Sequence, residues 1–164
     1  MILWAAWRGM ILIMGMMPIS TLEGMILEMR EYPPQWDALA ASATRGTDVP
    51  ANLLIAIACH ESAWGTAPNA IECCNPFGMM ARSGGLQVFD SETSAFARAA
   101  YLLNSHDLYA QPRSVFASEE SMTLLAARAL AHVWCPDDAH NWARSVHSIF
   151  HAIEARHENM IGGS

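Results

Sequence analysis

Apolar residues recur along much of the chain at spacings of three and four, which is the period of one face of an α-helix. A helix is therefore expected over about residues 21–31, where this spacing joins Leu22, Met25, Ile26 and Met29. Pro33 and Pro34 end that pattern, because proline interrupts a helix. A second helix is expected over about residues 35–44, closed by Gly46 as its C-terminal cap.

The third predicted helix contains the most apolar segment after the N-terminal region. Its residues 51–59, ANLLIAIAC, are apolar on nearly every side, which predicts a central and buried helix. Thr47 or Asp48 can cap its start, and Pro50 fits its first turn, where a missing N–H group costs nothing. The helix is expected to run on into the segment HESAWG and to end at Gly65.

The pattern changes between Asn75 and Phe89, where short extended pieces flank a turn at Gly84 and Gly85. This change predicts one small β-hairpin. Helical spacing then returns, and three further helices are expected to begin at capping residues, namely at Asp90 or Ser91, at Ser118, and at Asp137 or Asp138. The last of these helices carries an apolar stripe of Trp142, Val146, Ile149, Phe150 and Ile153. The chain is thus predicted to be mainly α, with five or six helices and one hairpin.

Composition narrows the class of protein. A length of 164 residues suits one domain with a real core. Hydrophobic residues make up 52% and charged residues 15%, which excludes a disordered chain. The net charge is −7 and no basic cluster is present, so we expect no binding to nucleic acid, which requires a basic face.

The N-terminal 18 residues form a separate apolar segment. Residues 9–17 are an uninterrupted apolar run that is too short to span a bilayer as a helix. The run is similar to the core of a signal peptide, but no basic segment precedes it and no A-x-A cleavage site follows. An export signal, a membrane-associated anchor, a core-packing segment and a start assigned too early remain open. Residues 19–164 are expected to form a single domain.

Cysteine and histidine spacing predicts no metal site. The four cysteines lack zinc-type C-x-x-C spacing, so a disulfide from Cys73 or Cys74 to Cys59 or Cys135, or four free thiols, are both open. Among the seven histidines, two lie four apart near the C-terminus, but no third ligand stands at a suitable spacing.

Glu61 is the residue whose position suggests chemistry. It follows Ile57 by four residues and Leu54 by seven, on faces of the apolar helix. A carboxyl group in apolar surroundings tends to stay protonated, and Trp64 lies within reach on the same face. Glycoside cleavage needs such a proton donor for the leaving oxygen. Position alone leaves open that Glu61 instead reaches solvent or pairs with an arginine.

Several motifs, in this order, resemble the glucosaminidase family of peptidoglycan hydrolases, which includes the muramidase-like domain of flagellar rod-assembly proteins and many autolysins. The first motif is a buried helix that ends in Glu-Ser-x-Trp-Gly, matched by Glu61, Ser62, Trp64 and Gly65. An Asn-x-Phe-Gly segment follows, matched by Asn75, Phe77 and Gly78. The segments at residues 89–91, 108–110 and 134–143 are similar to the family's later elements, so that the resemblance covers about residues 37–156.

The resemblance implies a lysozyme-like helical fold and cleavage of β-1,4 bonds after N-acetylglucosamine in the glycan strand of peptidoglycan. It implies that Glu61 is the general acid and that no metal or organic cofactor is needed. An exported or cell-wall-associated location would follow. It also implies a glycan groove with substrate-binding residues at Trp64, Asn75, Phe77, Tyr109 and Trp134. Aromatic rings stack on sugar faces, although core packing is the alternative for each aromatic residue.

The chain also departs from the family pattern. The family carries a second carboxylate in its β-lobe, but residues 78–89 contain no Asp or Glu. Asp90 is the candidate for this second catalytic group and is equally a candidate helix cap, while Glu72 precedes the hairpin. Trp134 stands where the family has a tyrosine. The departures leave open a lytic transglycosylase or muramidase, a catalytically weak wall-binding structural module, and a helical interaction protein. The sequence predicts no oligomeric state.

Overall fold

The computed structural model of the chain describes residues 30–118 and 123–162. Within these ranges the chain is mainly helical, which confirms the predicted mainly α class. The lysozyme-like part of that prediction remains an implication of the resemblance. The apolar segment at residues 1–18 and nearly all of the helix expected at 21–31 lie outside the described residues. No helix in the described ranges is long and apolar enough to cross a membrane.

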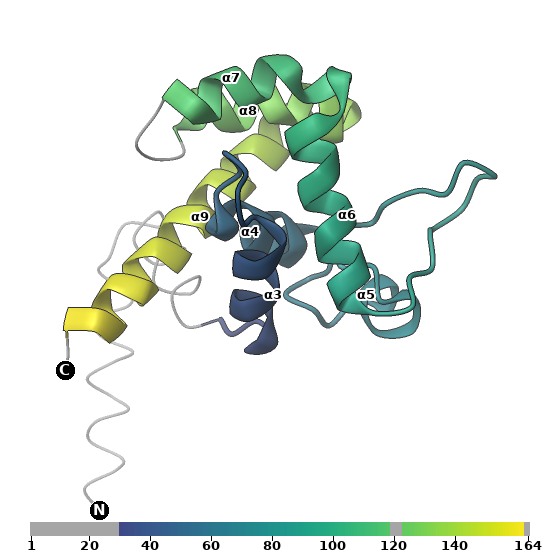
Figure 1. The fold of residues 1–164 in the computed structure, drawn as a ribbon, viewed down its shortest axis with the longest axis horizontal. Coiled ribbons are helices and arrows are strands. Elements are labelled where there is room, and N and C mark those ends of the chain that lie inside the picture. The colour runs from purple at the N-terminus through teal and green to yellow at the C-terminus, as the bar shows by residue number, and fades with distance from the viewer. Residues whose placement is uncertain (1–29, 119–122, 163–164) are drawn as a thin grey trace, which may run out of the picture. The chain divides into compact units, whose positions relative to one another are not determined.

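Seven α-helices are present in the described ranges (Figure 1). The sequence predicted five or six helices in all, and one of these lies almost entirely outside the described residues. The seven helices are α3 (Gln35–Ala43), α4 (Ala51–Glu61), α5 (Pro68–Cys73), α6 (Glu92–Ser105), α7 (Ala110–Ser118), α8 (Leu124–Trp134) and α9 (Ala139–Gly162). Two 3₁₀ turns, η1 (Asp107–Tyr109) and η2 (Pro136–Asp138), precede α7 and α9. The sequence did not predict α5 or α7. Helix α5 has only six residues, too few to show a period, and α7 has Pro112 in its first turn, where proline is tolerated.

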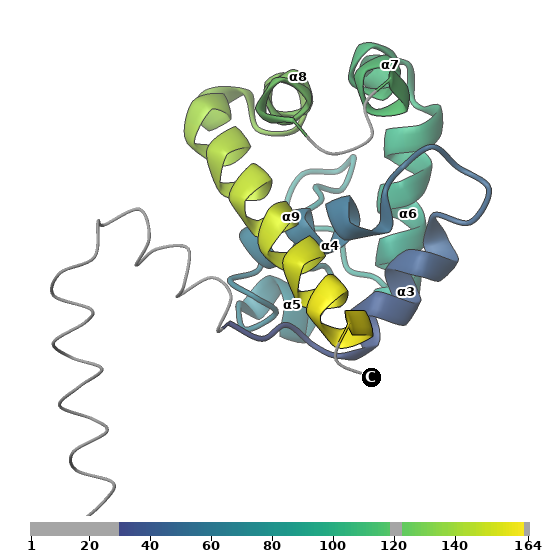
Figure 2. The ribbon, with the colours of Figure 1, turned by 90° about the vertical axis from the view of Figure 1, so that its left-hand side faces the viewer.

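Helix α4 is central, as predicted. Residues 53–59 are all buried, because the helix packs mainly against α9 and α3 and also meets α6 (Figure 2). Each Leu or Ile taken out of water in this way stabilises the fold by roughly 1.5–3 kcal/mol. The predicted stripe of α9 is buried as well, from Trp142 to Ile153. The core therefore lies where these two helices meet.

The start of α4 differs from the prediction. Pro50 itself is the N-cap residue, and neither Thr47 nor Asp48 caps the helix. The Thr47 hydroxyl instead accepts from the backbone N–H of Val49 and donates to the carbonyl of Thr44. These two bonds stabilise the turn before α4. Thr44 is also the C-cap of α3, so that Gly46 belongs to this turn and does not close the helix.

Two other caps resolve predicted alternatives. Ser91, and not Asp90, caps α6, because its hydroxyl accepts from the backbone N–H of Ser94. Thr123 caps α8 through the N–H of Ala126, whereas Ser118 is the last residue of α7. The prediction at Ser118 was wrong. Serine and threonine both carry a hydroxyl that can cap a helix, and nothing in the sequence indicates that Ser118 still belongs to the preceding helix α7.

The predicted β-hairpin is not present as two strands. Residues 79–88 form a loop with one isolated antiparallel bridge, between Met80 and Leu86. Gly84 and Gly85 both have positive φ, so that the predicted turn itself is present. Met80 and Leu86 are exposed, so the pair has no buried face to stabilise longer strands. We call this segment the 79–88 loop.

All four cysteines are free thiols in the structure. Cys59 lies in the core of α4, and burial raises the pKa of its thiol well above the ordinary range. The disulfide considered from the sequence is therefore not formed.

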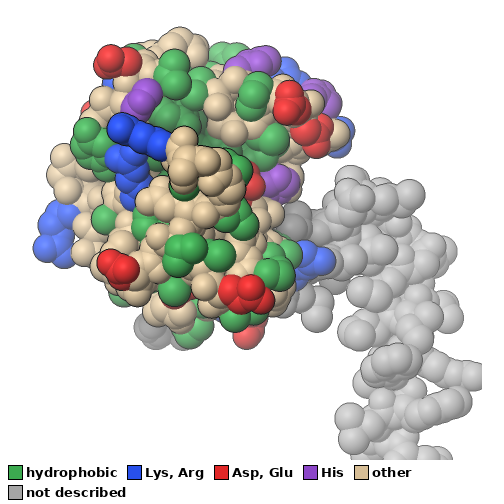
Figure 3. Space-filling model, turned by 90° about the vertical axis from the view of Figure 1, so that its right-hand side faces the viewer, with side chains coloured by type: hydrophobic (Ala, Val, Ile, Leu, Met, Phe, Trp, Pro, Cys, Tyr) green, Lys and Arg blue, Asp and Glu red, His purple; other side chains and the backbone are tan. Residues whose placement is uncertain are grey.

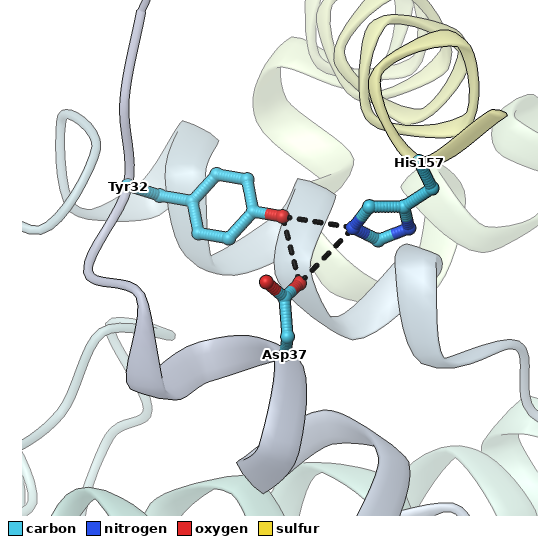
Figure 4. A network of polar contacts seen from close by, with 3 residues as sticks. All are labelled: Tyr32, Asp37 and His157. Atoms are coloured by element: carbon cyan, nitrogen blue, oxygen red, sulfur yellow. Dashed lines mark hydrogen bonds and ion pairs between the residues drawn. The ribbon is translucent and has the colours of Figure 1, made fainter. Parts of the chain in front are cut away.

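A polar network joins the start of α3 to the end of α9 (Figure 4). The hydroxyl of Tyr32 donates to Oδ1 of Asp37 at 2.7 Å. Nε2 of His157 lies 3.2 Å from the same carboxylate oxygen and 3.3 Å from the Tyr32 hydroxyl. Burial, followed by the hydrogen bond to Asp37, raises the pKa of Tyr32 above its ordinary value. We call these three residues the Tyr32–Asp37–His157 network.

Candidate active site

Glu61 is the last residue of α4, at the point where the buried helix leaves the core. Its side chain is half-buried, and its Oε1 accepts a hydrogen bond of 2.6 Å from the indole N–H of Trp142 on α9. Its other oxygen, Oε2, faces Gly78, because a Cβ atom added to Gly78 would lie 3.4 Å from it. One oxygen is thus held by the protein, and the other is directed to a residue without a side chain.

A tight turn fixes the end of α4. Ala63, Trp64 and Gly65 follow one another with positive φ angles of 48°, 64° and 84°. Such a conformation costs about 1–2 kcal/mol for each residue other than glycine. The Ser62 hydroxyl donates to the carbonyl of Ala58 and accepts from the N–H of Gly65, which secures the turn.

Gly65 is required in this turn by its surroundings as well as by its φ angle. A Cβ atom there would lie 2.8 Å from Cγ of Pro33. Ser62 and Gly65 of the sequence motif therefore position Glu61 and take no direct part in chemistry.

A tryptophan that lies outside the Glu-Ser-x-Trp-Gly motif donates a hydrogen bond to Glu61. Trp64 is only 8% exposed and does not line the pocket described below. Its backbone N–H bonds to the carbonyl of Cys59, within the turn. The indole that contacts Glu61 belongs to Trp142, which lies 81 residues further along the chain. Local spacing predicted Trp142 only as a core residue, and nothing in that spacing indicates its polar contact.

A pocket of about 240 Å³ lies beside Glu61, with Gly78 in its wall. The side chains around it come from the 79–88 loop, α6, η1 and α8. This pocket brings together three of the five predicted substrate-binding residues, Phe77, Tyr109 and Trp134. The complete lining is Phe77, Gly78, Met79, Met80, Gln87, Arg98, Leu102, Tyr109 and Trp134.

Aromatic rings connect the pocket wall to the residue that holds Glu61. Trp134 lies 6.4 Å from Phe77 and 6.1 Å from Tyr109, measured between ring centroids. On its other side it stacks on Trp142, with centroids 6.5 Å apart and planes inclined by 29°. Burial raises the pKa of Tyr109, so that its hydroxyl stays protonated well beyond neutral pH. The wall therefore offers neutral rings, with which sugar faces pack well.

Asn75 has a structural role in the loop beside the pocket. Its side chain is fully buried, and its Nδ2 donates to the carbonyls of Met79 and Gln87, each at 2.8 Å. Its Oδ1 accepts from the N–H of Met79 at 3.0 Å. The amide is occupied within the protein, and a substrate contact of Asn75 stays a prediction that this geometry does not support. Asn75 fixes both ends of the 79–88 loop that borders the pocket.

No carboxylate belongs to the lining of this pocket among the described residues, and Glu61 adjoins it through Gly78. Asp90 and Glu72 are both exposed and are not part of the lining. The carboxylate of Glu92, on α6, bonds to Trp36 and Gln35. A catalytic role for Asp90 stays a prediction that the geometry of the pocket does not support.

His60 precedes Glu61 on α4 and contacts two residues of α9. Its Nδ1 lies 2.9 Å from the hydroxyl of Ser145, and its ring meets the edge of Trp142 at 6.0 Å. Burial lowers the pKa of His60, while the charge of Glu61 opposes this effect.

Metal ligands do not gather at the site. Within the described residues, no group of three or more His, Cys, Asp or Glu side chains is placed to hold a metal ion. His147 and His151, which the sequence placed four residues apart, have ring centroids 4.6 Å apart on α9. A carboxyl group and an aromatic-lined pocket are thus the chemical features of this site.

An acid at the end of a buried helix, beside a pocket with aromatic walls, is an arrangement suited to a glycoside hydrolase. The Glucosaminidase family, described as mannosyl-glycoprotein endo-beta-N-acetylglucosaminidase, matches residues 37–155, and the chain belongs to this family. Membership implies a glycoside hydrolase with a glycan substrate. No curated protein and no solved structure matched the chain significantly.

Proposed function

We propose that this domain hydrolyses the glycan strand of peptidoglycan at the β-1,4 bond after N-acetylglucosamine, with Glu61 as general acid. The observation that carries the proposal is the geometry of Glu61, whose Oε1 is held by Trp142 while its Oε2 faces Gly78 in the pocket wall. Family membership supplies the class of bond, and the pocket supplies a place for the sugar.

Trp142 determines which oxygen carries the proton. An indole N–H is a donor only and does not titrate, so that Oε1 must accept from it. The carbonyl oxygen of a protonated carboxyl group is the stronger acceptor, so this hydrogen bond favours the acidic proton of Glu61 on Oε2, on the side of Gly78. From there it passes to the glycosidic oxygen as the bond to the anomeric carbon breaks. The leaving sugar departs with a hydroxyl group, and Glu61 becomes a carboxylate.

Completion of the reaction does not require a second carboxylate in the pocket. The carbonyl oxygen of the substrate's own 2-acetamido group can attack the anomeric carbon as the leaving oxygen takes the proton. Water then adds to that carbon and reforms the acetamido group, and the Glu61 carboxylate accepts a proton from the water. Among the described residues, no carboxylate other than the adjoining Glu61 is placed at this pocket, and this favours the substrate-assisted route.

The deciding experiment compares the wild type with Glu61→Gln on purified peptidoglycan, with the released ends identified by mass spectrometry. Glutamine keeps the size of the side chain but cannot donate an acidic proton, so we expect a loss of about 10²–10⁴-fold in kcat. The expected product has N-acetylglucosamine at its reducing end. Equal cleavage by Glu61→Gln would contradict the role of Glu61.

The products separate the alternatives. An anhydro-muramic end would identify a lytic transglycosylase, and a reducing muramic end would identify a muramidase. Glycan binding by the wild type without turnover would favour the wall-binding structural module. A high-mannose glycoprotein serves as the second substrate, because the family description names mannosyl-glycoproteins. Cleavage of that substrate alone would overturn the proposed substrate class.

A further inference from the structure

One charged side chain lines the pocket beside Glu61, and it is that of Arg98. Arg98 lies on α6, four residues before Leu102, so that the two side chains share one face of the helix. The other residues of the lining are neutral. A permanent positive charge is therefore placed in the wall of a pocket proposed to bind a glycan.

Arg98 has no ion pair with a carboxylate in the described ranges. The ion pairs there join His151 to Glu154 and His157 to Asp37. The guanidinium carbon of Arg98 lies 5.5 Å from the ring centroid of Tyr101, which is a cation–π distance. This contact orients the side chain and leaves its N–H donors available to a ligand.

Arg113 is used differently. Arg113, which follows on α7, donates to the carbonyls of Leu103 and His106 and so joins two elements of the chain. Figure 3 shows the face from which the 79–88 loop projects. On it, Arg side chains lie close together above and to the left of the middle, and Asp and Glu side chains are spread over other parts of the face. A local positive region on a chain of net charge −7 suits an anionic ligand.

We propose that Arg98 binds a carboxylate of the substrate and thereby selects acidic glycans over neutral ones. The inference rests on the proposed function. In peptidoglycan the carboxylate has two sources, the lactyl group of N-acetylmuramic acid where the stem peptide has been removed, and the stem peptide itself where it is present. The guanidinium group forms two parallel hydrogen bonds to either carboxylate.

The test uses three substrates. They are glycan strands stripped of peptides, intact peptidoglycan, and a neutral oligomer of N-acetylglucosamine. We expect Arg98→Gln to lower kcat/KM by about 10–100-fold on a carboxylate-bearing substrate and by less than threefold on the neutral oligomer. A loss on stripped strands identifies the lactyl carboxylate, and a loss only on intact peptidoglycan identifies the peptide. Arg98→Lys should recover part of the loss, since it keeps the charge but not the two-pronged geometry.

Arg128→Gln is the matched control, because Arg128 is exposed on α8 and does not line the pocket. It should leave activity on all three substrates unchanged. An equal loss for Arg98→Gln on the acidic and the neutral substrates, or no loss on any of them, would overturn the inference.

A binding measurement separates failure of this inference from failure of the proposed function. Dissociation constants are measured for Glu61→Gln and for the Glu61→Gln, Arg98→Gln double variant by calorimetry, which requires no turnover. Weaker binding of acidic strands by the double variant, with unchanged binding of the neutral oligomer, supports Arg98 even if the wild type cleaves nothing. Identical constants for the two proteins overturn the role of Arg98 even if Glu61 proves essential.

Discussion

Two carboxylates meet helix α9, Glu61 near its beginning and Asp37 near its end, and their partners differ in kind. Glu61 accepts from the indole of Trp142, which can donate but neither accepts nor titrates. Asp37 shares its Oδ1 between the Tyr32 hydroxyl and the ring of His157, and both of these groups exchange protons. An indole fixes a carboxyl group without competing for its proton. The first arrangement suits an acid catalyst, and the second suits a structural link between α3 and α9.

Of the variants that test this comparison, Trp142→Phe is expected to change kcat the most. The substitution keeps an aromatic ring in the core but removes the donor to Oε1 of Glu61. Because a small misplacement of a catalytic group costs up to about 10²-fold in rate, we expect kcat to fall about 10–100-fold. Steady-state kinetics on peptidoglycan, together with thermal unfolding, measures both the activity and the stability of the variant.

Trp36→Phe provides the matched control. Trp36 is also fully buried, and its indole also donates to a carboxylate, that of Glu92, at 2.9 Å. The two variants should lose similar stability, while Trp36→Phe should retain activity. A similar loss of activity in both would show that the effect comes from core packing and would break the comparison.

A smaller effect, on stability alone, is expected from Tyr32→Phe. The variant removes the hydroxyl from the Tyr32–Asp37–His157 network, and one net hydrogen bond is worth about 1 kcal/mol. Denaturant unfolding should show this decrease in the free energy of unfolding, with kcat within twofold of the wild type. Tyr101→Phe removes an exposed hydroxyl of α6 but keeps the ring that contacts Arg98, so that it should change neither quantity. If Tyr32→Phe lost as much activity as Trp142→Phe, the Tyr32–Asp37–His157 network would be part of the active site.

The smallest effect concerns pH and comes from His60, whose ring meets Trp142. Burial lowers the pKa of His60 in the folded chain, whereas in the unfolded chain it is about 6.5. Just below pH 6.5 the unfolded chain therefore binds more protons, and stability falls as the pH decreases through this window. His147 shifts in the same direction, through burial and then through the charge of His151.

His60→Gln removes one of these titrating groups and retains a polar side chain opposite Ser145. The decrease in Tm between pH 7.5 and pH 5 should therefore be smaller in the variant than in the wild type. Scanning calorimetry at matched ionic strength measures the slope. Parallel curves for the two proteins would show that His60 takes no part in the acid sensitivity.

The helical class of the fold and the position of Glu61, the proposed acid, follow from local signals. The all-apolar segment of α4 predicted a central helix, and the apolar stripe of α9 predicted its buried face. Both predictions are possible because the spacing of apolar residues indicates which side of a helix is buried. The motif that ends α4 placed Glu61 at the surface of the core. Ser91 was one of two capping candidates for α6, and the structure selects it.

Contacts between distant segments account for what the sequence did not predict. The bond from Trp142 to Glu61 joins residues 81 positions apart, and a buried tryptophan looks the same in a sequence whether its N–H is used or not. Asn75 was assigned to the substrate through the resemblance in its Asn-x-Phe-Gly motif, whereas its amide bonds to the backbone of the 79–88 loop. Distinguishing these roles requires the positions of partners, which spacing does not contain.

Both ends of the 79–88 loop are attached to Asn75, so that the position of the loop does not depend on its length. Met79 and Gln87 are joined to one buried amide, so that the residues between them can change without moving either end. Since doubling the length of a flexible loop costs only about 0.6 kcal/mol, the domain can accept longer or differently charged segments at this border of the pocket. Relatives could therefore diverge in substrate preference by exchanging this loop on a constant framework, and grafted loops offer a direct route to engineered specificity.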